Sequence, residues 1–191
     1  MQTHIRATLA AHIEVIGSLE RLIPDIERLA QRAAQCLAGG GRIFWAGNGG
    51  SAADCQHLAA EMVGRYQRER SGLASVALTT DTSILTSVGN DFGFGAIFAR
   101  QVEALCRPGD LLIGLSTSGN SANVLAAMRC AAELGVYRVG MAGRDGGRLL
   151  QETDLCLVVP TDNTARTQEA HILIGHIICD LVETQLAGDS R

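Results

Sequence analysis

The chain has 191 residues, of which 47% are hydrophobic and 19% are charged, and its formal net charge at pH 7 is −4. A chain of this size can bury one substantial core but is too short for two ordinary domains and a linker, so residues 1–191 are expected to form a single domain. The basic residues, all of them Arg, are scattered along the chain, which argues against the basic surface of a nucleic-acid-binding protein.

The first residues do not have the pattern of a targeting segment. Arg6, His12 and Glu14 interrupt the apolar residues near the N-terminus, so neither a signal peptide nor a membrane span is predicted. We therefore expect a cytoplasmic protein without a membrane partner. Six cysteines are widely spread without a CxxC pair, and we expect them to be buried, reduced thiols: Cys36, Cys55, Cys106, Cys130, Cys156 and Cys179.

Two helices are predicted at the start of the chain. Ile5, Leu9 and Ile13 recur at helical spacing, and a second helical stripe follows Pro24, a residue that suits the first turn of a helix. A run of three glycines ends this second helix. We expect residues 1–38 to form an N-terminal helical hairpin that is used in oligomerisation.

From residue 42 onward, short apolar runs alternate with helical segments. The runs are apolar on both faces, as is typical of strands buried between helix layers, and they are predicted at 42–47, 75–81, 110–116, 137–143 and 155–160. Helices are predicted at 51–66, 82–89, 94–106, 121–135 and 146–153, with one long helix over 164–188. The alternation predicts right-handed crossovers, and hence an α/β core over 42–188 with a five-stranded, parallel, doubly wound sheet.

Ligands of a doubly wound sheet bind at the carboxyl ends of its strands, where loops meet helix N-termini. The loops predicted there are GNGGS (47–51), TTDTS (79–83), STSGNS (116–121), AGRDGG (142–147) and PTDNTART (160–167). A helix N-terminus supplies N–H donors and partial positive charge. Ser51 and Ser121 also suit ordinary helix capping, but the hydroxyl groups in 116–121 exceed what one cap needs. This loop therefore predicts a phosphate site.

His57 and Glu61 are four residues apart, so on a helix both side chains point to the same face. The spacing suits a shared metal ion, a base with its partner, or an ordinary interior pair. The pair follows the glycine-rich loop on a helix whose other residues are mostly apolar. This places it near the expected ligand side of the sheet.

The last predicted helix offers further metal ligands or proton carriers among apolar residues: Gln168, Glu169, His171 and His176. His171 and His176 are five residues apart and project on different faces, so at most one is expected to share a site with a given partner. Gln168 and His176 are about 12 Å apart along an ideal helix. One ion can bind both only if the side chains lean together, the helix starts late, or a second chain contributes.

These motifs together resemble the sugar-isomerase (SIS) domain family, and within it the phosphoheptose isomerases. The resemblance covers nearly the whole chain and rests on residues 47–66, 79–105, 108–125, 143–147 and 164–183. Many sugar-binding SIS domains share the serine-rich loop. The stretches GNDFGF, HLAAE and QEAHILIGH are more specific.

The resemblance implies a flavodoxin-like aldose–ketose isomerase that converts D-sedoheptulose 7-phosphate into D-glycero-D-manno-heptose 7-phosphate. This is the first step towards the activated heptose of bacterial surface glycans such as lipopolysaccharide. The resemblance also implies one zinc ion per subunit, held by His57, Glu61, Gln168 and His176. It further implies a homotetramer with active sites between subunits, so that Glu61 and His176 are expected to converge from neighbouring subunits.

The resemblance assigns substrate contacts to Asn48, Gly49, Gly50, Ser51, Glu61, Asn90, Asp91, Ser116, Thr117, Ser118, Ser121 and Gln168. Interconversion of a ketose and an aldose needs a base to take a proton from the carbon beside the carbonyl group, and a carboxylate in a dry pocket suits that task. We expect Glu61 to be the base and His176 the acid. Ala165 departs from the aspartate that some relatives carry, and no role is assigned to it.

The main alternative is a non-catalytic SIS protein that binds the replication initiator DnaA. A third possibility is a regulatory SIS module that only senses a sugar phosphate. The group of DnaA-binding proteins lacks the Glu of HLAAE and the second His of the last helix, whereas this chain has Glu61 and His176. These two residues favour the enzyme.

Overall fold

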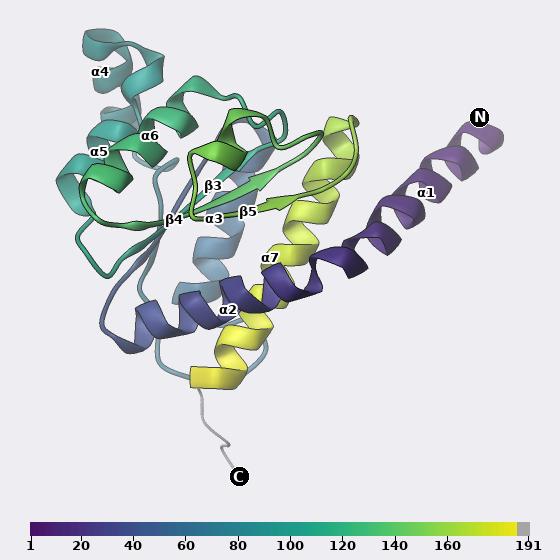
Figure 1. Cartoon of the computed structure of the whole chain (residues 1–191), viewed down its shortest axis with the longest axis horizontal. Coiled ribbons are helices and arrows are strands. Elements are labelled where there is room, and N and C mark those ends of the chain that lie inside the picture. The colour runs from purple at the N-terminus through teal and green to yellow at the C-terminus, as the bar shows by residue number, and fades with distance from the viewer. Residues whose placement is uncertain (187–191) are drawn as a thin grey trace.

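A parallel sheet forms the centre of the molecule, which a computed structural model describes over residues 1–186 (Figure 1). Its five strands are β1 (Ile43–Gly47), β2 (Ser75–Ala77), β3 (Leu111–Ser116), β4 (Tyr137–Ala142) and β5 (Leu155–Val158). They pair in the order β2-β1-β3-β4-β5, which is the flavodoxin-like order. The predicted fold class is confirmed.

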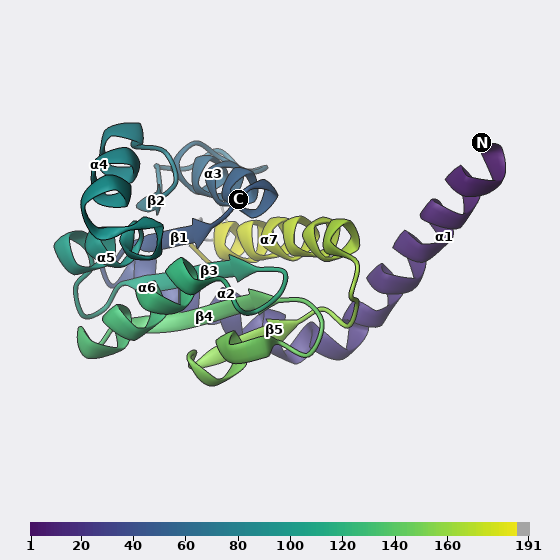
Figure 2. The same ribbon diagram turned by 90° about the horizontal axis from the view of Figure 1, so that it is seen from above.

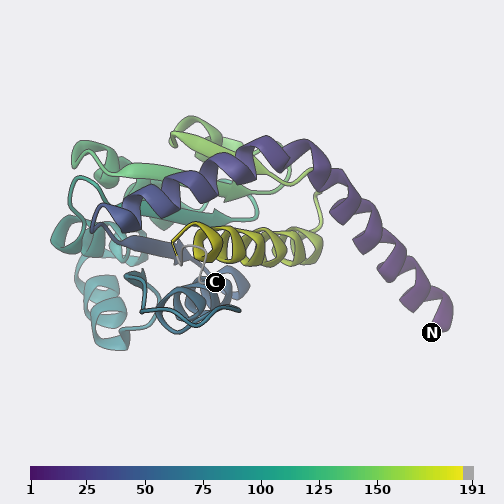
Figure 3. The same cartoon turned by 90° about the horizontal axis from the view of Figure 1, so that it is seen from below.

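Helices cover both faces of this sheet. Helices α2 (Ile23–Ala38), α3 (Gly50–Val63) and α7 (Thr164–Leu186) pack on one face and lie side by side in Figure 3. Helices α5 (Ala99–Leu105) and α6 (Ala122–Glu133) pack on the other. Because side chains alternate along a strand, Trp45 is buried in the first layer and Phe44 in the second. Both faces of the central strands are therefore apolar.

The N-terminal helices do not form the predicted hairpin. Helix α1 (Gln2–Gly17) is joined to α2 by the 3-10 helix η1 (Ser18–Leu22), and it extends away from the α/β body (Figures 2 and 3). Both junctions keep the right-handed helical conformation, so the chain does not reverse its direction. The side chains of Ile5, Leu9 and Ile13 consequently stay 51%, 58% and 69% exposed.

Several predicted elements differ in extent from the observed ones. Strand β2 is short because the chain leaves the sheet before Asp81, whose side chain caps α4 (Thr82–Phe92) by accepting a bond from Ile84 N. The helix predicted at 94–106 is divided into η2 (Phe94–Ala96) and α5, and the segment at 146–153 forms only the short 3-10 helix η3 (Gly147–Gln151).

Helix α7 is continuous from Thr164 to Leu186, as predicted. The predicted end of this helix and of the core at residue 188 lies outside the described residues. All six cysteines are free. The prediction that they are buried is confirmed for four of them, whereas Cys130 and Cys156 are half-buried. Among residues 1–186, no helix combines the length and the apolar character that crossing a bilayer requires.

Helices α3 and α7 run in the same direction and approach each other closely at Gly175. A Cβ atom added there would lie 2.5 Å from two methyl carbons of Leu58, which is fully buried. The small residue therefore sets the distance between the two helices.

We expect Gly175→Ala to lower the free energy of unfolding by about 1 to 3 kcal/mol, because overpacking outweighs the better helix propensity of Ala. Gly89→Ala in α4 is the matched control, since its added Cβ would meet only Ile97 Cγ2 at 3.8 Å. That change should raise stability by up to about 1 kcal/mol. Urea unfolding measures both, and a Gly175→Ala variant as stable as the parent would contradict the expectation.

Candidate active site

The loop between β3 and α6 holds its hydroxyl groups on a rigid frame. The Oγ atoms of Ser116 and Ser121 are 2.9 Å apart, and Ser121 N donates to Ser116 Oγ at 3.3 Å. Gly119 adopts a φ of +65°, and a Cβ atom on it would overlap the carbonyl oxygen of Gly146. The 142–147 loop thus packs directly behind the 116–121 loop and fixes its shape.

The two serines that suited ordinary capping do not cap their helices. Ser121 precedes α6, but its hydroxyl group is engaged with Ser116. Ser51 lies inside α3, which begins at Gly50 and follows Gly49 with a φ of +56°. Interpreting them as simple caps is therefore wrong. In the first turn of α6, Val124 N donates to Asn123 Oδ1 at 3.0 Å, and the backbone N–H groups of Ala122 and Asn123 remain available to an anion.

A pair of asparagines ties the 47–51 loop to the start of α6. Asn48 Nδ2 donates to Asn123 Oδ1 at 2.8 Å, and Asn123 Nδ2 donates to Asn48 Oδ1 at the same distance. Asn123 is buried. The two glycine- and serine-containing loops are therefore held next to each other, and a hollow of about 160 Å³ opens beside Asn48, Gly49 and Thr79.

Three potential metal ligands converge between α3 and α7. His57 Nε2 lies 3.0 Å from His176 Nε2 and 3.3 Å from Glu61 Oε1, and the ligand atoms of all three lie within 4.8 Å of one another. All three belong to one chain, which corrects the expectation that Glu61 and His176 meet from neighbouring subunits. The physical reason is the parallel packing of α3 and α7, which brings the two imidazoles together without a second chain.

The cluster fits a zinc ion by its donor set and spacing. Zinc takes imidazole nitrogen and carboxylate oxygen at about 2 Å, so two of its ligands in tetrahedral geometry lie roughly 3.3 Å apart. The measured separations of 3.0 and 3.3 Å are close to this value. The side chains of His57 and Glu61 are 49% and 24% exposed, which leaves an approach open for a ligand.

The other polar residues of α7 lie elsewhere. The Gln168 carboxamide lies against Gly50, where an added Cβ would be 2.5 Å from Nε2. Gly50 precedes His57 by about two helical turns, a rise of roughly 10 Å, so the role of Gln168 as a fourth ligand stays a prediction. Glu169 pairs with Arg166 and with His12 Nδ1 of α1, the latter at 2.7 Å.

Asn90 and Asp91 lie at the end of α4, apart from α7 (Figure 1). Both are exposed, and Asn90 Nδ2 donates to Asp91 Oδ1 at 2.8 Å. Their predicted contact with substrate stays a prediction. The exposed aromatic rings of Phe92 and Phe94 follow directly in the chain.

Sequence reasoning missed three residues around the cluster and its loop. Asp54 lies three residues before His57, and its buried Oδ2 has no hydrogen-bond partner in the described chain. Burial raises the pKa of this carboxyl, and His57 partly opposes the change. The spacing of 54, 57 and 61 on one helical face was a signal that could have found it.

Asn123 and Tyr66 left weaker signals. Asn123 follows the serine-rich loop within the resembling stretch, but nothing in its pattern indicated a bond to Asn48. The Tyr66 ring stacks on the His176 ring with 5.5 Å between centroids and 22° between planes. The helix predicted at 51–66 includes Tyr66, but α3 ends at Val63, so helical periodicity could not place the ring.

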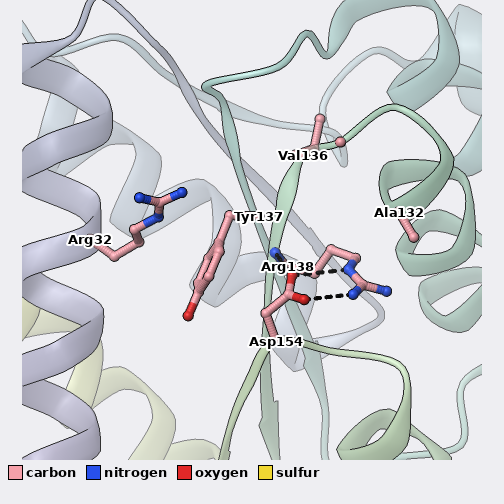
Figure 4. Close-up of a pocket in the computed structure, with 7 residues that line it drawn as sticks. Arg32, Ala132, Val136, Tyr137, Arg138 and Asp154 are labelled. Carbon is pink, nitrogen blue, oxygen red and sulfur yellow. Dashed lines mark hydrogen bonds and ion pairs between the residues drawn. The ribbon is translucent and has the colours of Figure 1, made fainter.

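A second pocket, of about 250 Å³, lies at the opposite, amino ends of β4 and β5 (Figure 4). Its central charges are already paired, because Arg138 donates to both carboxylate oxygens of Asp154, at 3.0 and 2.6 Å. The guanidinium of Arg32 lies over the Tyr137 ring, 4.5 Å from its centroid. This pocket lacks the nucleophiles and proton carriers of the site between α3 and α7.

Comparison with known proteins decides the family. The family model of the SIS domain matches residues 9–143. The chain belongs to the SIS domain family. Within it, the chain is 50% identical to the phosphoheptose isomerase of Geotalea daltonii over 100% of both chains. It is 56% identical to the phosphoheptose isomerase of Geobacter sulfurreducens over 95% of this chain and 97% of the relative.

A solved structure gives the same result. Phosphoheptose isomerase GmhA from Neisseria gonorrhoeae superposes with a TM-score of 0.91 at 46% identity, covering 95% of this SIS chain and 98% of the other. These relatives place the chain among the sugar-phosphate isomerases, which are enzymes of the aldose–ketose type. The resemblance proposed from the sequence is thus confirmed.

His171 belongs to the core of this SIS domain and not to the site. It is fully buried, and its Nε2 lies 3.2 Å from the carbonyl oxygen of Ala142. Burial lowers the pKa of His171 to about 4, and the bond to Ala142 only partly opposes this. His171 and His176 thus face different surroundings, as their spacing predicted.

His171 should make the stability of the domain depend on pH. In the unfolded chain the imidazole of His171 has a pKa of about 6.5. As the pH falls, this imidazole therefore binds a proton in the unfolded chain before it does so in the folded domain. The free energy of unfolding then decreases as the pH drops from 6.5 towards 4. Between pH 7.5 and 5 the expected loss is about 2 kcal/mol. His171→Gln should remove this part of the dependence. Unfolding by urea at both pH values measures it, and an unchanged slope would refute the assignment.

Proposed function

We propose that this SIS enzyme converts D-sedoheptulose 7-phosphate into D-glycero-D-manno-heptose 7-phosphate, the first step towards the activated heptose of bacterial surface glycans such as lipopolysaccharide. The observation that carries the proposal is the convergence of His57, Glu61 and His176 in one chain. The similarity to relatives that are phosphoheptose isomerases supports the heptose phosphate as substrate.

Glu61 is the proposed base and His176 the proposed acid. Glu61 takes a proton from C1 of the ketose, next to the carbonyl group, and returns it to C2, the former carbonyl carbon. His176 moves the proton of the C1 hydroxyl group to the oxygen on C2, so that an aldehyde replaces the ketone. The ligand atoms of the two side chains lie within 4.8 Å of each other, which suits groups that act on adjacent carbon and oxygen atoms.

We propose one zinc ion per subunit, held by His57, Glu61 and His176, with Gln168 as the expected fourth ligand. When bound, the ion acts as a Lewis acid that polarises the carbonyl oxygen and stabilises developing negative charge. Both imidazoles must be neutral to bind the ion. The two Nε2 atoms are 3.0 Å apart. Their lone pairs then repel each other unless a cation lies between them or one nitrogen carries a proton. An atom whose lone pair is bound to the ion cannot accept a proton, so Glu61 and His176 move protons only through the oxygen or nitrogen that the ion leaves free.

The phosphate group is proposed to bind at the 116–121 loop, beside the 47–51 loop. Ser116, Thr117, Ser118 and Ser121 supply hydroxyl groups, and the start of α6 supplies N–H donors. Asn48, Gly49, Gly50 and Ser51 form the neighbouring wall for the sugar. Binding energy from the phosphate orients the reacting carbons at Glu61.

We further propose a homotetramer in which residues 1–38 serve in association, residues 42–188 form the catalytic core, and Asn90 and Asp91 reach a neighbouring subunit's site. Helix α1 buries none of its residues. An exposed apolar stripe of this kind is typical of an interaction face. The free cysteines suit a reducing compartment, which supports the cytoplasm as its location.

Glu61→Gln should lower kcat by at least about 10²-fold, because the amide cannot accept the proton from C1. Glu133→Gln is the matched control, since Glu133 is exposed at the end of α6, away from the site. Turnover of sedoheptulose 7-phosphate into an aldose is measured with and without a chelator. Full activity of Glu61→Gln would overturn the assignment of the base, and no aldose from the parent enzyme under any condition would favour a sugar-phosphate sensor or a DnaA-binding adaptor.

Thr117→Val should raise KM about 10-fold or more and leave kcat nearly unchanged, because it removes one hydroxyl group from a charged ligand in the ground and transition states alike. Thr184→Val is the control, an equal change at an exposed position near the end of α7. Steady-state kinetics with sedoheptulose 7-phosphate separate the two constants. A normal KM would place the phosphate elsewhere.

A further inference from the structure

The segment after α3 is fastened to α7 by a single buried carboxylate. Glu183 has no exposed surface, and its Oε1 accepts a bond from Tyr66 N at 2.7 Å. Its Oε2 accepts bonds from Gln67 N and Arg68 N, each at 2.9 Å. Three successive backbone N–H groups thus point at one side chain of α7.

Arg70 completes this arrangement from the other side. Its Nη2 lies 3.0 Å from Glu183 Oε1 and donates to the carbonyl oxygen of Glu61 at 2.9 Å. Its Nη1 donates to the carbonyl oxygens of Met62 and Gly64 at 2.8 and 3.2 Å. Arg70 therefore satisfies the last carbonyl groups of α3 while it pairs with α7.

We propose that Glu183 is a positioning residue for the isomerase site, which sets α3 against α7 through Arg70 and holds Tyr66 against the ring of His176. The inference rests on the proposed function, because His57, Glu61 and His176 are the groups that Glu183 would position. Glu183 touches none of the three side chains itself and acts through Arg70 and Tyr66.

The register between the two helices depends on this clamp. His57 and Glu61 are on α3, whereas His176 is on α7, seven residues before Glu183. The chain between the two helices is about one hundred residues long, so the connection does not fix how far one helix is shifted along its axis relative to the other. Arg70 binds the carbonyl group of Glu61 itself, so the clamp at Glu183 connects the carboxylate-bearing turn of α3 directly to α7.

The orientation of the His176 ring depends on Tyr66. Its ring packs between Tyr66, which is stacked on it, and His57, which meets it edge to face with 5.1 Å between centroids. Rotation of the ring would move Nε2 away from its 3.0 Å contact with His57 Nε2. Because the backbone of Tyr66 is bonded to Glu183, the stacking partner is itself fixed in place.

Glu183 has no spare capacity for proton transfer. Burial by itself would raise the pKa of its carboxyl, but the three backbone N–H groups and Arg70 outweigh burial, and the pKa is lowered. The group therefore stays ionised at neutral pH. Nearby Asp180 differs, because it pairs with Arg68 at 2.6 Å on the surface, where both side chains are more than 40% exposed.

The test compares four variants by readouts that a purely structural role would leave unchanged. Glu183→Gln removes the charge and turns one acceptor into a donor, Tyr66→Ala removes the stacking ring, and Tyr66→Phe keeps it. Asp180→Asn is the matched control on the same helix. Circular dichroism establishes that each variant folds. The NMR signals of the His176 imidazole are then recorded without metal, and the zinc affinity is measured by competition with a chelator.

We expect Glu183→Gln and Tyr66→Ala to shift the His176 signals and to weaken zinc binding about 10- to 100-fold, the range found for groups that orient metal ligands. In the same variants kcat should fall more than KM rises. Tyr66→Phe and Asp180→Asn should resemble the parent. If Glu183→Gln does not fold, Tyr66→Ala still tests whether the held Tyr66 ring positions His176, because the contacts of Glu183 stay intact in that variant.

Unchanged His176 signals and zinc affinity in folded Glu183→Gln, or in Tyr66→Ala, would overturn the inference. Failure of the proposed function has a different signature. In that case the parent protein forms no aldose from sedoheptulose 7-phosphate, whereas the His176 signals still change in Tyr66→Ala.

Discussion

The parallel packing of α3 against α7 is the constraint on which the chemistry of this SIS domain depends. The two helices lie far apart in the sequence, yet they carry the two halves of the cluster formed by His57, Glu61 and His176. Gly175 lets the helices approach at one level, and the buried pair of Arg70 and Glu183 joins them about two turns further along. A cluster assembled from two rigid helices keeps its geometry more firmly than one on loops.

The proposed phosphate site differs from the cluster of His57, Glu61 and His176. There the backbone, and not a charged side chain, would attract the ligand. Contacts with neighbouring segments hold the 116–121 loop. Gly119 packs so closely against the carbonyl group of Gly146 that no Cβ atom fits, and the side-chain amides of Asn48 and Asn123 are paired. With its loop preformed, the N-terminus of α6 can meet an anion without a reorganisation cost. A chain with a net charge of −4 can thus bind a phosphate through local potential alone.

The sequence predicted most of the sheet because its strands are apolar on both faces, and it predicted the pair of His57 and Glu61 because helical spacing is a local property. It could not predict what depends on contacts between distant segments. The hairpin expected at the N-terminus failed because no local signal distinguishes a reversal from a straight continuation through η1. The meeting of Glu61 with His176 in one chain, the stacking of Tyr66 and the clamp at Glu183 all arise from the packing of α3 on α7, which no periodicity encodes.

Glu61 and Glu183 show how surroundings, and not residue type, separate chemistry from structure in this fold. Both are glutamates at the same interface of α3 and α7. Glu183 is fully buried, and its oxygens are bonded by three N–H groups and a guanidinium, so it has no free lone pair in a useful direction. Glu61 keeps 24% of its side chain exposed, and within residues 1–186 its carboxylate pairs with one side chain, that of His57, at 3.3 Å. Only a carboxylate with unfilled acceptor positions facing an open site can accept a proton from a substrate, and this difference supports Glu61 as the proposed base and Glu183 as the proposed positioning residue.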